Sequence, residues 1–342
     1  MRRWIYASIA AIGLLLVALA GAVFWSAQRT ERPVGFQVGR STSALGKPVA
    51  IAVWYPTSAR PLPTTLLGVT LMAVARDGPV QGERLPLVLL SHGNGGGPGS
   101  HVDLALALAD AGYVVAAPVH RGDNVEDSSG LSSPMFWGNR SQELRGTLDY
   151  LLNSWPGRSQ LDPTRIGAFG FSAGGFTVLT AVGGRPNLRI IPFHCATQPE
   201  FVCDVLRAGN SPLLKDNAEA VDAFAADRRI RAVVLAAPGL GFTFANGGLS
   251  DVAVPIQLWT GEKDRVTPHA SNGAIIQDQL GEQVEAHSVP GASHPSFLVP
   301  CRLLQPPALC RDEDGFDRAE FHRRMNADVI AFFDSVLAPT RP

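Results

Sequence analysis

The stretch that could do chemistry most directly is residues 165–175, RIGAFGFSAGG, which carries one serine among several glycines. Ser172 stands between Gly170 and Gly174, which matches the G-x-S-x-G pattern of a nucleophile elbow. At such a strand-to-helix turn the serine holds its hydroxyl clear of the sheet, and a Cβ two positions before or after it would collide with neighbouring backbone. A tight turn with an incidental serine is the alternative. The position of the motif between a predicted buried strand and a predicted helix favours the elbow.

A serine nucleophile needs a general base, and the base needs an acid that orients it. Around such an elbow the chain order is serine, then aspartate or glutamate, then histidine. Asp264 follows an apolar segment at 255–260 and would stand at the carboxyl end of that strand. Glu262 lies in the same loop and is the second choice, whereas Asp251 precedes the strand and would face the opposite end. We predict Asp264 as the acid; a turn or helix-capping aspartate is the simpler interpretation.

His294 is the predicted base. It lies in the sequence GASH at 291–294, directly after the last predicted strand, and it follows Asp264 in the required order. Four other histidines compete with His294, but their predicted places are less suitable. One lies in a proline-rich region, one near a helix start, one inside a strand, and one at a strand end where the side chain could support the pocket. These are His194, His269, His287 and His120, respectively.

Backbone N–H groups are predicted to stabilise the negative oxygen that acyl transfer generates. One is the N–H of Ala173, which follows the nucleophile. The other comes from the loop 91–97, SHGNGGG, which is close to the HGGG type. We assign this second donor to Asn94, with Gly93 and Gly95 as alternatives. A phosphate-binding loop is the rival interpretation, but the chain has no GxxxxGKS or GxxxxGKT pattern there.

Apolar segments and helical patterns alternate along the chain. Strands are expected at 49–55, 85–90, 113–119, 165–169, 231–237, 255–260 and 284–289, and helices at 101–111, 141–152, 173–182, 271–280 and 316–337. This alternation predicts an α/β fold with a mostly parallel central sheet and helices on both faces, which binds ligands at the carboxyl ends of its strands. Residues 61–82 are expected to be irregular. Residues 184–229 are rich in proline and are expected to form an insertion or cap around the site.

The N-terminus resembles a targeting segment. Met1, Arg2 and Arg3 precede an uncharged apolar run at 4–25. Basic residues before such a run predict that the body of the protein is exported. The run is long enough to span a bilayer, which takes about 20 residues, but the sequence ALA at 18–20 could also be a cleavage site. We expect residues 1–30 to be a signal peptide or a membrane anchor, and residues 31–342 to be a folded domain in the periplasm or outside the cell.

The four cysteines form two local pairs. We expect the disulfides Cys195–Cys203 and Cys301–Cys310, since an oxidising compartment allows them, although three connectivities are possible. A zinc site is the alternative, but CxxC spacing is missing and His194 is the only neighbouring ligand.

Composition excludes some functions. The net charge is −1 over 342 residues and no lysine- or arginine-rich tract is present, so nucleic-acid binding has little electrostatic support. No motif indicates a metal or an organic cofactor, and the sequence predicts no oligomeric state.

Together these residues resemble the α/β-hydrolase superfamily, and more narrowly its dienelactone-hydrolase-like and platelet-activating-factor-acetylhydrolase-like serine hydrolases. The matching segments span nearly all of the chain after the N-terminal segment; they are AVWYP at 52–56, LPLVLLSHGNGG at 85–96, LADAGYVVAAPVHRGDN at 108–124, DPTRIGAFGFSAGG at 162–175, GEKDRVTP at 261–268 and GASHPSF at 291–297. Dienelactone hydrolases themselves use a cysteine nucleophile, and Ser172 in its place argues for ordinary ester hydrolysis. The resemblance implies a carboxylic ester hydrolase without a cofactor, acting on a small-molecule or lipid ester with a short acyl chain.

Two other functions fit the same fold. A catalytically inactive hydrolase fold used as an exported binding module would have a broken triad, whereas all three members are present in this sequence. A peptidase would use the same triad. A pocket for an N-terminal amine or a propeller domain would favour the peptidase, and the sequence indicates neither.

Overall fold

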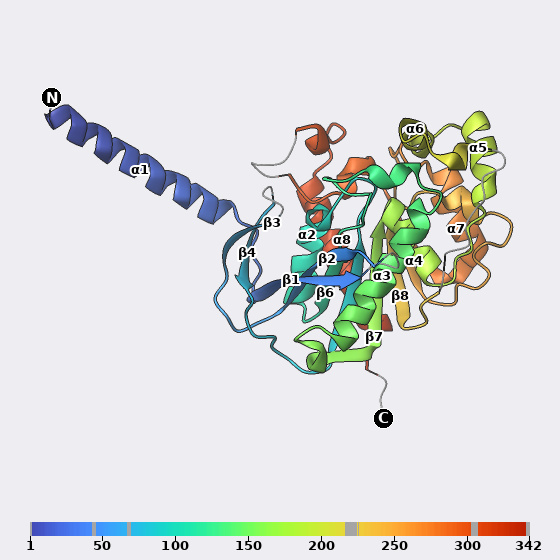
Figure 1. Ribbon diagram of the computed structural model, residues 1–342, viewed down its shortest axis with the longest axis horizontal. Helices are drawn as coiled ribbons and strands as arrows, with labels where there is room; N and C mark the ends of the chain where they lie inside the picture. The colour runs from blue at the N-terminus through green and yellow to red at the C-terminus, as the bar shows by residue number, and fades with distance from the viewer. Residues whose placement is uncertain are drawn as a thin grey trace.

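A ten-stranded sheet forms the centre of the molecule. The computed structural model describes residues 2–42, 46–66, 70–215, 224, 226–301 and 307–339. Within them the strand order is β10-β9-β8-β7-β5-β6-β2-β1-β4-β3 (Figure 1). The strands from β10 to β6 are parallel, β2 is antiparallel to both β6 and β1, β1 is parallel to β4, and β3 is antiparallel to β4. The bounds are β1 Val34–Thr42, β2 Pro48–Pro56, β3 Leu62–Leu66, β4 Thr70–Arg76, β5 Leu85–Ser91, β6 Val114–Pro118, β7 Leu161–Phe171, β8 Ile230–Ala236, β9 Ile256–Gly261 and β10 Val284–Val289.

Helices cover both faces of this sheet and enclose two apolar cores. On one face α2 and α8 pack against side chains such as Val88 and Phe169. On the other face α3, α4 and α7 pack around Leu87 and Ile166. The bounds are α1 Arg2–Ser26, α2 Val102–Asp110, α3 Phe136–Asn153, α4 Ala173–Ala181, α5 Ile191–Thr197, α6 Phe201–Ala208, α7 Gly273–Leu280 and α8 Arg318–Val336. The predicted fold class, a mostly parallel α/β sheet with helices on both faces, is confirmed.

The N-terminal end of the sheet differs from the expectation. Residues 62–66 and 70–76 are not irregular, because they form β3 and β4, which pair antiparallel with Pro63 opposite Ala73. Residues 67–69 lie outside the described residues. Proline is tolerated in β3 because this is an edge strand, where a missing N–H breaks no ladder within the sheet. β1, which no pattern indicated, pairs with β2 from Val34 opposite Pro56 to Thr42 opposite Pro48. α3 also begins earlier than residue 141.

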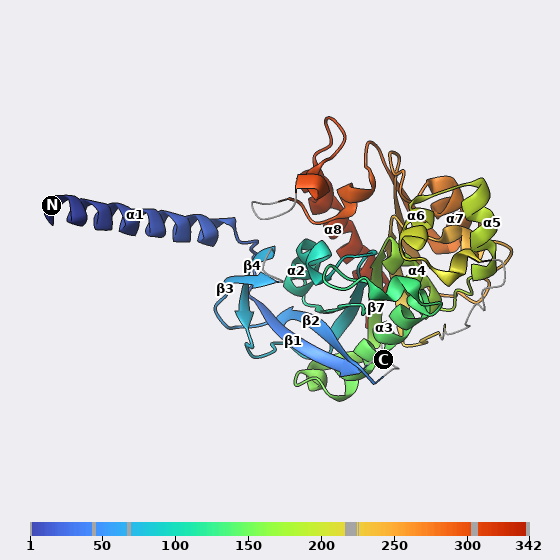
Figure 2. The same cartoon turned by 45° about the horizontal axis from the view of Figure 1, so that its top comes forward.

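The region 184–229 contains two short helices, α5 and α6, which lie side by side at one end of the molecule (Figures 1 and 2). The disulfide Cys195–Cys203 joins them. A second disulfide, Cys301–Cys310, closes the chain between β10 and α8. Both pairings are those expected from the sequence. Residues 216–223 and 225 of the expected insertion lie outside the described residues.

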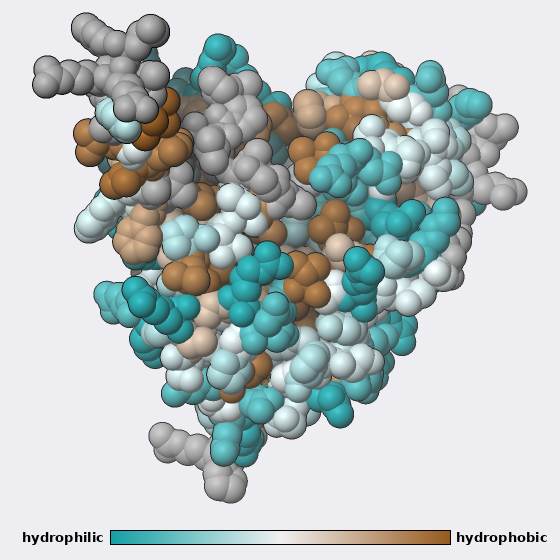
Figure 3. All heavy atoms as spheres, turned by 60° about the vertical axis from the view of Figure 1, so that its left-hand side comes forward, coloured by the Kyte–Doolittle hydropathy of each residue, from teal (hydrophilic) through white to brown (hydrophobic). Residues whose placement is uncertain are grey.

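α1 projects away from the body of the molecule (Figures 1 and 2). The chain that follows it is fixed to the sheet, because Gln28 donates to Leu71 O and accepts from Ala73 N. Many of the described side chains of α1 are large, apolar and exposed, among them Leu14 and Leu15. Apolar side chains gather at the upper left of Figure 3. Over the described residues, no helix is both long and apolar enough to cross a membrane. The membrane anchor predicted for residues 4–25 stays a prediction.

The packing of α8 on β7 generates a stability prediction. Phe333 is fully buried, and its ring lies so close to the strand that a Cβ on Gly167 would be 2.5 Å from it. Phe333→Ala should lower the free energy of unfolding by about 3–5 kcal/mol, since it leaves a cavity between helix and sheet. Urea denaturation measures the change. The control Phe193→Ala, at a side chain that is 73% exposed, should change stability by no more than about 0.5 kcal/mol. Equal effects of the two substitutions would contradict the prediction.

Candidate active site

Ser172 lies at the turn between β7 and α4, in a backbone conformation that non-glycine residues seldom adopt (φ 55°, ψ −120°). Its N–H donates to Ala236 O on β8 at 3.0 Å. A Cβ on Gly174 would be 1.9 Å from Ser91 O, and a Cβ on Gly170 would be 2.2 Å from Gly174 O. The glycines are therefore required by close backbone contacts on both sides of the serine, and these contacts hold the turn in its strained form.

Asp264 and His294 lie in the loops after β9 and β10, and their side chains are in contact. His294 Nδ1 is 2.7 Å from Asp264 Oδ2, which places the proton on Nδ1 and makes the carboxylate the acceptor. Thr267 Oγ1 also donates to Asp264 Oδ2, and the backbone N–H groups of Val266 and Thr267 donate to Oδ1. The carboxylate is thus fixed from several sides. Glu262, the second choice from the sequence, is exposed and does not share this contact.

His294 packs against the residue that precedes Ser172. Phe171, which precedes the serine, packs its ring 4.7 Å from the imidazole of His294. Among the hydrogen bonds of the described residues, none joins Ser172 to His294. In free enzymes this bond is often long and tightens only when substrate is bound.

The other histidines take different roles. His194 stacks on Phe242 with ring centroids 3.6 Å apart. His287 stacks on Trp259 at 4.0 Å. His269 is exposed, and His120, in the loop that follows β6, is fully buried. None of them contacts Asp264.

Two backbone N–H groups are available beside the serine. Ala173 is the first residue of α4, so its N–H has no partner within the helix. The N–H of Asn94 makes no hydrogen bond to another described residue. The N–H of Gly95, an alternative to Asn94 in the sequence analysis, is already bonded to Asp123 Oδ1 at 2.7 Å. Asn94 is therefore better placed than Gly95 to donate to a ligand.

A pocket of about 420 Å³, including the space at its mouth that is open to solvent, lies over Ser172. Its walls come from α3, α6 and the loops after β5, β7, β8 and β9. The described residues that line it are Asn94, Phe136, Trp137, Ser172, Ala173, Phe201, Val202, Val205, Gly239, Leu240, Val266 and Thr267. None of these side chains carries a charge, so the pocket suits a neutral, largely apolar group.

Metal binding has no geometric support in the described part of the chain. No group of three or more histidine, cysteine, aspartate or glutamate side chains lies there in a position to hold an ion.

The fold of this chain is similar to that of solved structures. No family model matches the chain, and no curated protein matches its sequence. A ferulic acid esterase from Streptomyces cinnamoneus is 19% identical with a TM-score of 0.60, over 93% of this chain and 95% of its own. This chain has the α/β-hydrolase fold. A puromycin-hydrolyzing peptidase from Mycobacterium tuberculosis (16% identity) and a puromycin hydrolase (14%) each have a TM-score of 0.52 and match 89% of this chain but 39% of their own length.

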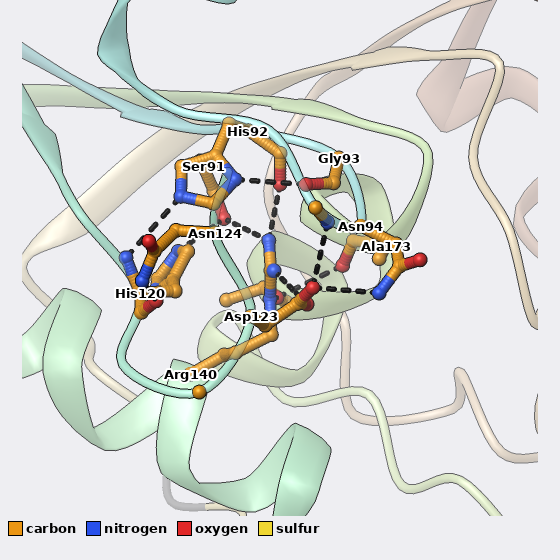
Figure 4. Close-up of polar contacts among 12 residues, drawn as sticks. Ser91, His92, Gly93, Asn94, His120, Asp123, Asn124, Arg140 and Ala173 are labelled. Atoms are coloured by element: carbon orange, nitrogen blue, oxygen red, sulfur yellow. Dashed lines mark hydrogen bonds and ion pairs between the residues drawn. The ribbon is translucent and has the colours of Figure 1, made fainter. Parts of the chain in front are cut away.

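Beneath the nucleophile elbow of this α/β-hydrolase fold lies a buried polar cluster (Figure 4). At its centre Arg140 of α3 is paired with Asp123, and both side chains are at most 1% exposed. The sequence analysis missed both residues. A signal for Arg140 was present, because it falls on the apolar stripe of its helix, between Trp137 and Leu144. A charged residue on such a stripe is seldom buried unless it is paired.

The same region holds a second serine–histidine–acid arrangement. His120 Nε2 is 2.9 Å from Ser91 Oγ, and His120 Nδ1 is 3.0 Å from Glu143 Oε2. All three side chains are at most 2% exposed, so no substrate reaches them. Burial, together with the charge of Arg140, lowers the pKa of His120 well below its usual value. Burial raises the pKa of Glu143 to about 7.

The crowded elbow predicts a sharp difference between two glycines. Gly174→Ala places a methyl group against the Ser91 carbonyl, so the turn has to open, and we expect a loss of more than about 3 kcal/mol of stability or failure to fold. Gly146→Ala, inside α3, is the matched control. The added Cβ would lie 3.4 Å from Thr42 O of β1, which is an ordinary van der Waals contact. This substitution should be neutral or stabilising by up to about 1 kcal/mol. Thermal unfolding of the two variants compares them, and similar melting temperatures would exclude the contact as described.

The raised pKa of Glu143 predicts a pH-dependent stability difference. Between about pH 4.5 and 7 the folded chain holds this proton while the unfolded chain has lost it, so the contribution of Glu143 falls as pH rises through this window. Relative to Glu143→Gln, which cannot ionise, the wild type should lose on the order of 3 kcal/mol across it. Above pH 7 the difference should stay level. Urea denaturation of both proteins from pH 4.5 to 8.5 measures it, and parallel curves would show that Glu143 has an ordinary pKa.

Proposed function

We propose that this protein is a serine hydrolase that cleaves carboxylic esters through Ser172, His294 and Asp264. The observation that carries the proposal is the contact between His294 Nδ1 and Asp264 Oδ2. It orients an imidazole that packs on Phe171, the residue before Ser172 at its strained elbow. A catalytically inactive binding module would have no need for this arrangement.

The proposed reaction passes through an acyl-enzyme. Ser172 Oγ attacks the ester carbonyl while Nε2 of His294 takes its proton. Asp264 holds the imidazole in the tautomer that leaves Nε2 free and stabilises its charged form. The N–H groups of Ala173 and Asn94 hold the negative oxygen of the tetrahedral intermediate. His294 then protonates the leaving alcohol, and water hydrolyses the acyl-enzyme by the same route.

The lining of the pocket supports an ester with an apolar group. Phe136, Trp137 and three residues of α6 surround the serine, and no lining side chain is charged. A peptidase that binds a free N-terminal amine needs a carboxylate near the serine, and the described lining offers none. The narrower resemblance to the dienelactone-hydrolase-like and acetylhydrolase-like enzymes favours a short acyl chain or a lipid-like ester. The ferulic acid esterase on the same fold is consistent with an ester substrate.

We further propose that the chain acts outside the cytoplasm. Two disulfides are present, and such bonds persist in oxidising compartments. Residues 1–30 would then be the targeting segment and residues 31–342 the hydrolase domain, with 184–229 as its cap.

The decisive test compares the full chain with Ser172→Ala. Wild type should hydrolyse p-nitrophenyl esters and be labelled by a fluorophosphonate, while the variant should lose kcat by about 10⁴-fold or more and take up no label. A series from acetate to palmitate gives the size of the acyl pocket. Ser159→Ala, at an exposed serine, is the control and should behave as wild type. A folded wild type that neither labels nor hydrolyses any of these esters would overturn the proposal.

A further inference from the structure

Arg140 connects the two segments that carry the free N–H groups. Its Nε donates to Thr177 Oγ1 at 3.0 Å, and Thr177 Oγ1 in turn donates to Ala173 O at 2.9 Å. On its other side the guanidinium donates to the backbone carbonyl of His92 and, at 3.4 Å, to Ser91 Oγ. One planar group thus bonds α4 at Thr177 and, at the same time, the end of β5 and the first residue after it.

Asp123 extends this connection to the tip of the loop. Its Oδ2 accepts from Arg140, while its Oδ1 accepts from Asn94 Nδ2 at 2.6 Å and from Gly95 N at 2.7 Å. Figure 4 shows the carboxylate between the guanidinium and the Asn94 side chain. Asp123 therefore fixes the side chain of Asn94 and the peptide that follows it, next to the Gly93–Asn94 peptide that carries the free N–H.

We infer that Arg140 and Asp123 are positioning residues that hold the two oxyanion N–H donors, on Asn94 and Ala173, at a fixed separation. This inference rests on the proposed function. An oxyanion hole works only when both donors point at the same site, and a displacement near 1 Å can cost about 10²-fold in rate. The arginine is suited to this task because its rigid fork donates in several directions, which a lysine ammonium on a flexible stem does not.

Stability alone gives no reason for this buried pair. A buried ion pair is often no more stabilising than apolar residues of similar volume, because both charges lose their hydration. Apart from the bond between them, the side-chain hydrogen bonds that Arg140 and Asp123 make to described residues go to the segment 91–95 or to Thr177, which bonds Ala173 O at the start of α4. The side chains of Arg140 and Asp123 therefore bond mainly to the two segments that carry the free N–H groups of Asn94 and Ala173.

The test uses two variants and one matched control in the full chain. Arg140→Lys keeps a positive charge beside Asp123 but cannot reach all the partners of the guanidinium. Thr177→Val removes only the hydroxyl that links Arg140 to Ala173 O, and Thr177→Ser restores it. Thr147→Val is the control, because Thr147 is equally buried and makes the same kind of bond, to Glu143 O at 2.8 Å, without contacting Arg140.

The readouts are kcat and KM for p-nitrophenyl butyrate, and the inhibition constant of an alkyl trifluoromethyl ketone, whose adduct with the serine carries an oxyanion. We expect kcat to fall about 10-fold in Thr177→Val and about 100-fold in Arg140→Lys, with KM changed less than about twofold. The ketone should bind more weakly by similar factors. Thr177→Ser and Thr147→Val should stay near wild type in both readouts.

Two results would overturn the inference. Unchanged kcat and ketone affinity in folded Thr177→Val and Arg140→Lys would show that the pair does not position the donors. Equal losses in Thr147→Val and Thr177→Val would show a general effect of helix stability. In both cases wild type remains active, which separates this failure from that of the proposed function, where wild type itself neither hydrolyses esters nor binds the ketone.

Discussion

The close approach of α4 to the loop after β5 is the constraint on which the rest of the site depends. The backbone of Gly174 lies against the carbonyl of Ser91 at a distance that admits no Cβ. This contact brings the free N–H of Ala173, at the start of α4, next to the loop that carries the free N–H of Asn94. It also obliges the chain to turn from β7 into α4 at Ser172. The strain of that turn, of order 1–3 kcal/mol, is sustained only because packing on both sides leaves no other path.

The interior beneath the turn is polar, and its protonation states are mutually consistent. Burial and the nearby Arg140 lower the pKa of His92 to about 3, so its ring is neutral. The neutral ring accepts from the N–H of His120 through Nε2 and donates from Nδ1 to Gly93 O. A guanidinium does not lose its proton, so the carboxylate of Asp123 and the surrounding oxygens have to compensate its charge. A fully bonded network of this kind is rigid, which is what a pair of fixed N–H donors requires.

Local patterns were enough to predict the parts of the site that depend on neighbours in sequence. The elbow at Ser172, the loop at Asn94 and the positions of Asp264 and His294 after strands all follow from motif and strand order. The apolar stripe of α3 singles out Arg140. The roles of Arg140, Asp123 and Glu143 could not be predicted from local patterns, because they depend on contacts between segments 17 to 49 residues apart. β1 was missed for a related reason. Its Gly35 faces the ring of Tyr55, so an aromatic side chain from β2 fills a position where the pattern shows no apolar residue.

The two sides of the pocket are held in place by different interactions. One side carries the N–H donors, and the other carries apolar side chains that a substrate would contact. The side with the N–H donors is fixed by buried charges. The opposite wall is α6, whose Phe201, Val202 and Val205 face the serine. The start of α6 is attached to the body through Glu200, which accepts from Ser271 and Asn272, and α6 is joined to α5 by a disulfide. Because Phe201, Val202 and Val205 belong to α6 and the donors do not, we expect substitutions in α6 to reshape the pocket without altering the segments that carry the donors. In the proposed hydrolase, the choice of ester could therefore change while the reaction at Ser172 stays the same.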